Sequence, residues 1–272
     1  MLPTVQIFGK TLSMYVAFNA LSVFVGLIVM VIVTVHFSKV LHPAKKNLAY
    51  KAPRVKYIVS TMISFLVAYV FLYMGTQLIG KIKFKDMNME GVAFIGGVLL
   101  FIPVFVLFAY HLPNNGDTLS QLERTFPSLA IMQCFNRLAC TCAGCCFGVP
   151  FKLGLTYQRN TPAVLKYGLQ TRLFPTAPFE SFVMLIAFIV IIIFMMKKKK
   201  DTLHLFPIFF GGVGLVNQFL MGDLRGIMIW KIFDVQQMGY MILIALGLFF
   251  YFYRQYDRKK AEVKLLKPKK AH

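Results

Sequence analysis

The chain has 272 residues, of which 58% are hydrophobic and only 15% are charged, yet its formal net charge is +20. This composition excludes an ordinary soluble domain, because several apolar runs approach the ~20 residues that cross a bilayer as a helix. The basic residues lie in loops and a tail between these runs, where they fit lipid headgroups better than nucleic acid. We therefore predict an all-α, polytopic helical membrane protein with no nucleic-acid partner.

The apolar segments predict about seven transmembrane helices. In chain order they cover residues 12–35, 57–79, 92–110, 128–142, 179–196, 203–221 and 235–253. We expect one membrane domain over residues 1–254 and a basic cytoplasmic tail over residues 255–272. The first segment is too long for a cleaved signal peptide and lacks a small-residue cleavage site, so none is expected.

Three strongly basic segments predict the orientation of the chain in the membrane. They are the loop 36–56, the lysine run 197–200 and the tail. With the N-terminus outside, all three fall in the cytoplasm, as the positive-inside rule requires. We predict an N-out/C-in topology, in which Arg137 and Glu180 lie near the outer ends of their helices. A site opening to the outer leaflet is the expected consequence.

The fourth segment is predicted to be short and interrupted. Residues 111–125 are rich in turn formers and predict a polar turn, after which Pro127 suits the first turn of a helix. That helix is expected over residues 128–142, with a break at 144–148. Non-helical backbone at membrane depth is tolerated only where it lines a cavity or is buried in protein. The pattern therefore predicts a broken or re-entrant fourth segment beside a cavity.

The stretch 136–148, N-R-L-A-C-T-C-A-G-C-C-F-G, concentrates the functional groups of the chain. An arginine at membrane depth usually faces a cavity, a headgroup or a partner, so Arg137 is either a ligand for phosphate or half of a structural ion pair. The cysteines could bind metal, act as redox thiols or simply pack in a tight turn. No histidine lies in the stretch and no second pair of ligands accompanies it. We therefore expect packing, with no metal ligand and no cofactor.

The same stretch resembles the signature of the prolipoprotein diacylglyceryl transferase family, in the branch with an R-[IL]-G-C-F-x-A-G-C-C-[YF]-G pattern. Other blocks follow the order seen in that family. They are Ser13-Met14-Tyr15, F-I-G-G at 94–97, F-P-T-A-P-F-E at 174–180, Q-F-L-M-G-D-L-R-G at 218–226 and F-D-V-Q-Q at 233–237.

The resemblance implies a transferase that moves the diacylglyceryl group of phosphatidylglycerol to a thiol of a lipobox-containing precursor peptide, at the outer face of the bacterial cytoplasmic membrane. It implies that Arg137 binds the headgroup and that Glu180 and Asp223 are the catalytic candidates. The other substrate-binding residues that it implies are Arg225, Gly96, Gly97, Gly144, Gly148, Tyr15, Cys140 and Cys145. For Gly96 and Gly97, close helix packing is the simpler explanation.

The sequence departs from the family pattern at several positions. Ile95 stands where related enzymes have histidine, and Cys140, Ala143 and Cys145 stand where they have Asn, Asn and Glu. Two alternatives to the transferase function therefore stay open. One is a catalytically lapsed paralogue that binds phospholipid or a lipidated peptide. The other is a thiol-redox or metal-binding membrane protein that uses the cysteines of the stretch.

Overall fold

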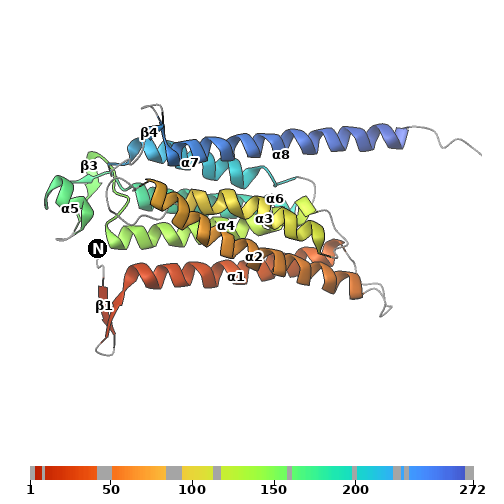
Figure 1. Cartoon of the computed structure of the whole chain (residues 1–272), viewed down its shortest axis with the longest axis horizontal. Coiled ribbons are helices and arrows are strands. Elements are labelled where there is room, and N and C mark those ends of the chain that lie inside the picture. Colours follow the sequence, from red (N-terminus) through yellow and green to blue (C-terminus); the bar gives the residue numbers. More distant parts are fainter. Residues whose placement is uncertain are drawn as a thin grey trace, which may run out of the picture.

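The computed structural model describes residues 4–7, 10–41, 51–83, 94–112, 118–157, 161–197, 201–222, 228–229 and 233–266. The helices in this part of the chain are α1 (Met14–Leu41), α2 (Lys51–Lys83), α3 (Phe94–His111), α4 (Thr118–Ala143), α5 (Pro162–Tyr167), α6 (Thr176–Met196), α7 (Leu205–Leu220) and α8 (Val235–Leu266). All except the short α5 run side by side along the long axis of the molecule (Figure 1).

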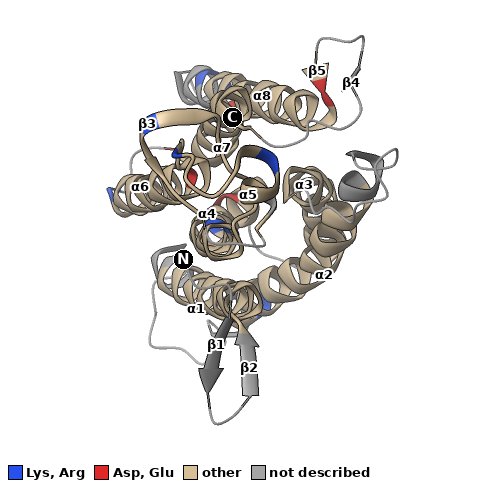
Figure 2. Cartoon of the chain, turned by 90° about the vertical axis from the view of Figure 1, so that its left-hand side faces the viewer, with Lys and Arg blue, Asp and Glu red and all other residues tan. Residues whose placement is uncertain are grey.

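Helix α4 is the centre of this bundle. It contacts α1, α3, α6 and α7, while α2 packs on α3 and α7 packs on α8. Figure 2 looks along the bundle and shows α4 between α1 on one side and α6 and α7 on the other. Because its neighbours surround it, α4 can hold polar side chains that would be costly to expose to lipid.

Aromatic side chains fill the core between α3, α4 and α7. Phe126 stacks on Phe206 with ring centroids 5.1 Å apart, and Phe206 stacks on Phe210 at 5.6 Å. Other large apolar side chains, such as Phe24, Tyr73 and Phe182, are exposed on the outside of the bundle. An apolar outer surface on helices of this length is what a lipid environment requires.

Five helices are long and apolar enough to cross a membrane, as judged by length and composition in the described part of the chain. They are Met14–His36, Val55–Leu78, Phe94–His111, Thr176–Met196 and Val235–Asp257; Leu205–Leu220 is apolar but shorter. These helices fit the predicted polytopic helical membrane protein. The count of seven spans and the N-out/C-in orientation stay predictions, and so does the division into domain and tail, although α8 continues into the predicted tail.

The predicted start of the fourth helix was wrong. Helix α4 begins at Thr118, within the expected polar turn, and Pro127 lies inside it. The polarity of this segment reflects buried contacts: Gln121 donates to the Ser60 hydroxyl at 3.1 Å, and Ser128 donates to the Gly26 carbonyl at 2.8 Å. At 26 residues, α4 is about 39 Å long, so the shortness of the predicted helix was also wrong.

The break after α4 is confirmed, because the helix ends at Ala143 and Gly144 follows with φ +69°. Short extended segments also flank the helices. They are the antiparallel pairs β1 (Thr4–Ile7) with β2 (Lys10–Ser13) and β4 (Met228–Ile229) with β5 (Phe233–Asp234), and the single strand β3 (Pro150–Leu155). These strands were not predicted, and Leu12 and Ser13 of β2 had been expected within the first membrane helix. All of them lie at the end of the bundle where α4 ends (Figure 1).

Candidate functional site

A buried ion pair joins α4 to α6 near this end of the bundle. The Arg137 Nε lies 2.8 Å from the Glu180 Oε1, and the two side chains are 10% and 0% exposed. Burial of either charge alone would be very unfavourable, so each group makes the burial of the other possible. The first turns of α6 and the last turns of α4 therefore carry the charged centre of the molecule.

Two buried amides hold the carboxylate of this pair. Gln133 Nε2 donates to Glu180 Oε1 and Asn217 Nδ2 donates to Glu180 Oε2, each at 2.7 Å. Gln133 lies four residues before Arg137 and thus on the same face of α4, while Asn217 comes from α7. Both oxygens of Glu180 are engaged, so the carboxylate is fixed in position by three helices.

Further buried polar residues continue the network toward α8. Gln218 donates to Gln236, and Asp234 and Gln237 exchange backbone–side-chain hydrogen bonds of 3.0 and 2.7 Å. The reciprocal bonds of Asp234 and Gln237 have the form of a capping box and fix the start of α8. Tyr240, which is almost fully buried one turn later, lies within electrostatic range of Arg137 and Glu180.

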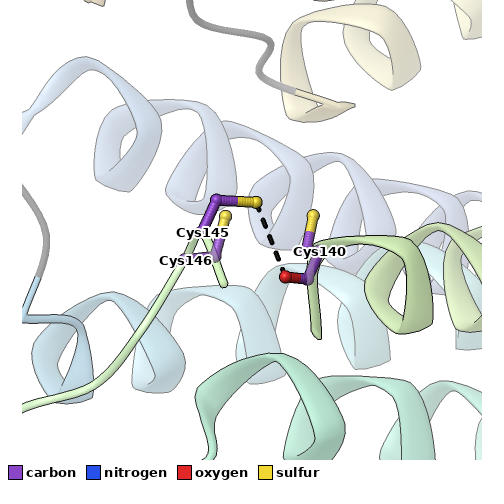
Figure 3. A group of neighbouring side chains, drawn as sticks. All are labelled: Cys140, Cys145 and Cys146. Carbon is purple, nitrogen blue, oxygen red and sulfur yellow. Dashed lines mark hydrogen bonds between the residues drawn. The ribbon is translucent and has the colours of Figure 1, made fainter. Parts of the chain in front are cut away.

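The turn after α4 brings three cysteines together. The sulphur atoms of Cys140, Cys145 and Cys146 all lie within 4.8 Å of one another (Figure 3). Cys145 Sγ donates to the Cys140 carbonyl at 3.6 Å, and Arg137 Nη1 donates to the Cys146 sulphur at 3.6 Å. The guanidinium therefore contacts a carboxylate on one side and a thiol on the other.

A small cap, built from residues 147–157 and 161–175, covers the turn. A Cβ on Gly144 would lie 2.7 Å from Thr161 Cγ2, and one on Gly148 would lie 2.5 Å from the Phe174 carbonyl oxygen. Gly148 donates from its backbone to Phe174 O, and Val149 donates to Leu220 O. Gly144 thus lets the cap lie close against the turn, and Gly148 lets the chain lie close to Phe174 and to the end of α7.

Tyr157 is the largest polar side chain buried in this cap. Burial raises its pKa to about 12, so the phenol is neutral at neutral pH. Its ring packs against the position of Gly144, and its hydroxyl has no hydrogen-bond partner within the described residues. The turn is therefore covered by an uncharged aromatic ring.

The structure places the predicted site residues in three groups. Arg137, Glu180, Cys140, Cys145, Gly144 and Gly148 come together at the end of α4, and Tyr15 lies within electrostatic range of the cysteines. Gly96 and Gly97 lie instead in the contact of α3 with α2, where a Cβ on Gly97 would be 2.4 Å from the Leu72 carbonyl oxygen. Asp223 and Arg225 lie outside the described residues.

Gln133, Asn217 and Tyr240 are site residues that the sequence pattern does not predict. A usable signal existed for Gln133, because a polar residue one turn before a buried arginine shares its helix face. Asn217 and Tyr240 carried no comparable signal. Their place next to Glu180 depends on how α7 and α8 pack on α4 and α6, which a local sequence pattern does not determine.

Comparisons with known proteins identify the family of the chain. The family model described as prolipoprotein diacylglyceryl transferase matches residues 4–253. A relative from Clostridium tetani (strain Massachusetts / E88), called phosphatidylglycerol–prolipoprotein diacylglyceryl transferase, is 30% identical over 160 residues. That alignment covers 58% of this chain and 60% of the relative. From the match over nearly its whole length, the chain belongs to the prolipoprotein diacylglyceryl transferase family.

Proposed function

We propose that the protein is a membrane transferase that moves the diacylglyceryl group of phosphatidylglycerol to a cysteine thiol of a lipoprotein precursor. Family membership supports the reaction class, and the name of the Clostridium tetani relative pairs the same two substrates. The observation that carries the proposal is the buried Arg137, which Glu180 holds in place at one end of the bundle.

Arg137 is the proposed ligand of the lipid phosphate. A guanidinium has five N–H donors, and a phosphodiester is an anion that matches its planar fork. Glu180 engages the Nε of the group, while the terminal nitrogen Nη1 contacts Cys146 in the cysteine turn. A headgroup entering from that side would meet a cation whose orientation is already fixed.

The reaction forms a bond from the acceptor sulphur to a glyceryl carbon and breaks the bond from that carbon to the phosphate oxygen. Glycerol phosphate leaves with the electron pair of the broken bond, and the thiol gives up its proton. Negative charge therefore grows on the leaving phosphate, where a fixed arginine stabilises it. This is the step that Arg137 is proposed to accelerate.

The contacts of Glu180 favour a positioning role over that of a general base. Both carboxylate oxygens already accept hydrogen bonds or pair with Arg137, and the side chain is fully buried. A base for the thiol proton must reach the acceptor, which a carboxylate engaged in this way does poorly. The catalytic assignment of Asp223 remains a prediction, as do the headgroup contacts of Arg225.

The proposed location is the cytoplasmic membrane of a bacterium, with N-out/C-in topology and the site facing the outer leaflet. The charge pattern of the loops supports this orientation. The site itself lies where α4 ends and α6 begins, at one end of the bundle rather than at its middle (Figure 1). That depth suits a lipid headgroup, whose phosphate lies at the membrane surface.

A direct transfer assay tests the proposal. Purified protein in detergent is mixed with phosphatidylglycerol labelled in its acyl chains and with a lipobox peptide, and transfer of label to the peptide is measured. We expect transfer by the wild type and loss of about 100-fold or more in Arg137→Ala. Arg172→Ala is the matched control, because Arg172 is exposed in the cap and its side chain hydrogen-bonds only the Lys152 carbonyl among the described residues.

The lapsed-paralogue alternative makes a different prediction in the same experiment. The substitutions at Ile95 and Cys145 remove groups that related enzymes carry, so lipid binding without turnover is its signature. Well-folded protein that binds phosphatidylglycerol through Arg137 but labels no lipobox peptide would rule out the transferase proposal in favour of this alternative. Growth of a strain depleted of its own transferase provides the matching test in cells.

A further inference from the structure

The three-cysteine cluster has a geometry that the transferase proposal does not use. Cys140 lies in the last turn of α4, which ends at Ala143, while Cys145 and Cys146 follow the break. All three sulphur atoms lie within 4.8 Å of one another. From the sequence alone no metal ligand is predicted here, because no second pair of ligands accompanies the stretch. The fold instead brings three cysteines of one stretch together, because the chain turns back on itself within a few residues after α4.

The backbone of the turn is what makes the sulphur atoms converge. Side chains of consecutive residues in extended chain point to opposite sides, so neighbouring cysteines do not normally face one partner. Here Cys146 has φ +53°, which is uncommon for a residue other than glycine, and Gly144 has φ +69°. The turn thereby directs both Cys145 and Cys146 to the side of Cys140 (Figure 3).

The spacing suits a metal ion. In a tetrahedral zinc site, bonds of ~2.3 Å to sulphur place the sulphur atoms roughly 3.8 Å apart. A limit of 4.8 Å between the three sulphur atoms means that small side-chain rotations would close the site. Thiolates are soft ligands that prefer zinc or copper(I) over magnesium or calcium.

The charges around the cluster favour a divalent ion. Three thiolates and a divalent cation leave one net negative charge, which requires a cation nearby in a buried place. Arg137 lies next to this charge, since its Nη1 is 3.6 Å from the Cys146 sulphur; because it also pairs with Glu180, the cluster, Arg137 and Glu180 together keep one negative charge. With a monovalent ion the cluster would carry a second negative charge beside Glu180, which is less favourable.

We propose that Cys140, Cys145 and Cys146 bind one zinc-class divalent cation through their sulphur atoms. Within the described residues no further His, Cys, Asp or Glu joins the group, so the fourth coordination position is open to water or to an incoming thiol. The proposal does not depend on the transferase activity.

Cobalt(II) titration of the full-length protein tests this site. The reduced protein in detergent is freed of metal and titrated with Co²⁺, which shows intense thiolate charge-transfer absorption in the near ultraviolet when bound by cysteine. We expect one Co²⁺ per chain, displaced by Zn²⁺. Cys140→Ser, Cys145→Ser and Cys146→Ser should each weaken Co²⁺ binding by about 100-fold or more, because each removes a ligand.

Cys142→Ser is the matched control. Cys142 belongs to the same sequence motif but not to the cluster, so its loss should leave the Co²⁺ absorption unchanged. Thermal unfolding of each variant separates loss of metal from loss of fold. Where a serine variant unfolds, Co²⁺ absorption of the corresponding alanine variant decides whether the ligand or the packing was lost.

Three results would overturn the proposal. The first is absence of thiolate absorption with Co²⁺ in folded, reduced wild-type protein. The second is loss of binding in Cys142→Ser with retention in Cys145→Ser. The third is a disulphide within the cluster in protein isolated from cells without reductant, because a disulphide removes two of the ligands. All three readouts are spectroscopic or analytical, so they leave the transfer assay as an independent test of function.

Discussion

Helix α4 carries a buried arginine near each of its ends, and the two differ in what surrounds them. Arg124 and Arg137 are each 8% exposed and stand roughly 20 Å apart along the helix. Arg137 pairs with a buried carboxylate that two amides hold, and it contacts the cysteine turn. Arg124 donates to the neutral Tyr57 hydroxyl and lies over the Tyr57 ring at 5.1 Å.

The comparison shows that burial of an arginine does not by itself indicate a site. Both residues would be costly at membrane depth, and both have found partners. The contacts of Arg124 include the hydroxyl and the ring of Tyr57, which join α4 to α2. Arg137 lies where three features meet. They are the hydrogen-bond network of Glu180, the irregular turn after α4 and the cap of residues 147–157 and 161–175. The irregular backbone next to the charge is what distinguishes the two ends.

The largest difference is expected between substitutions of two acidic residues. Glu180 pairs with Arg137, and Glu123 precedes Arg124 in the sequence. Glu180→Gln leaves Arg137 charged, buried and unpaired, and should lower the free energy of unfolding by about 3–5 kcal/mol. Glu123→Gln, near the other end of α4, keeps an oxygen that can accept hydrogen bonds from Thr202 and loses its electrostatic attraction to Arg254, and should lower the free energy of unfolding by about 1 kcal/mol. Denaturant unfolding in detergent measures both; a larger loss in Glu123→Gln would reverse the assignment of the charged centre.

A conservative exchange of each arginine sharpens the comparison. Arg137→Lys keeps the positive charge for Glu180 but loses the planar fork that matches a phosphate, and should lower the transfer rate by about tenfold or more. Arg124→Lys keeps a cation at the opposite end and should leave the rate per folded molecule close to that of the wild type. Initial rates, normalised to the monodisperse fraction in gel filtration, compare them. Equal losses would show that the fork at Arg137 has no special function.

The smallest expected effect concerns the irregular backbone itself. Gly144→Ala places a Cβ at positive φ and 2.7 Å from Thr161 Cγ2, which should lower the free energy of unfolding by about 1–2 kcal/mol. Gly212→Ala, inside α7 with no neighbour within 4 Å of its Cβ, should leave that free energy unchanged or raise it by up to about 1 kcal/mol. Thermal unfolding gives the order, and a more stable Gly144→Ala protein would show that the turn carries no strain.

The sequence predicted the helical membrane fold and the key stretch because both depend on local chemistry. Long apolar runs indicate membrane helices, and the change from helix to glycine-rich turn is visible at Gly144. The start of α4 was misjudged because the polar turn was extended as far as residue 125 and Pro127 was taken as a first-turn proline. The helix instead begins at Thr118, and Gln121, within the expected turn, is buried against a neighbouring helix.

The site was predictable in part for the same reason. Arg137 and Glu180 were singled out separately, and the resemblance to the family placed both in one site. Their direct contact, and the amides that hold Glu180, depend on the packing of three helices that lie far apart in sequence. The compactness of the cysteine cluster was missed because it depends on the backbone angle of Cys146, which residue type does not predict.

The pairing of Arg137 with Glu180 also bears on how the chain is assembled in the membrane. Chains are made from the N-terminus, so α4 leaves the ribosome before α6 and α7 exist. During that interval Arg137 has neither its carboxylate nor the Gly148 backbone bonds that close the cap. The end of α4 therefore reaches its stable position only after α6 and α7 have been made. The C-terminal half of the chain thus completes the fold of the bundle.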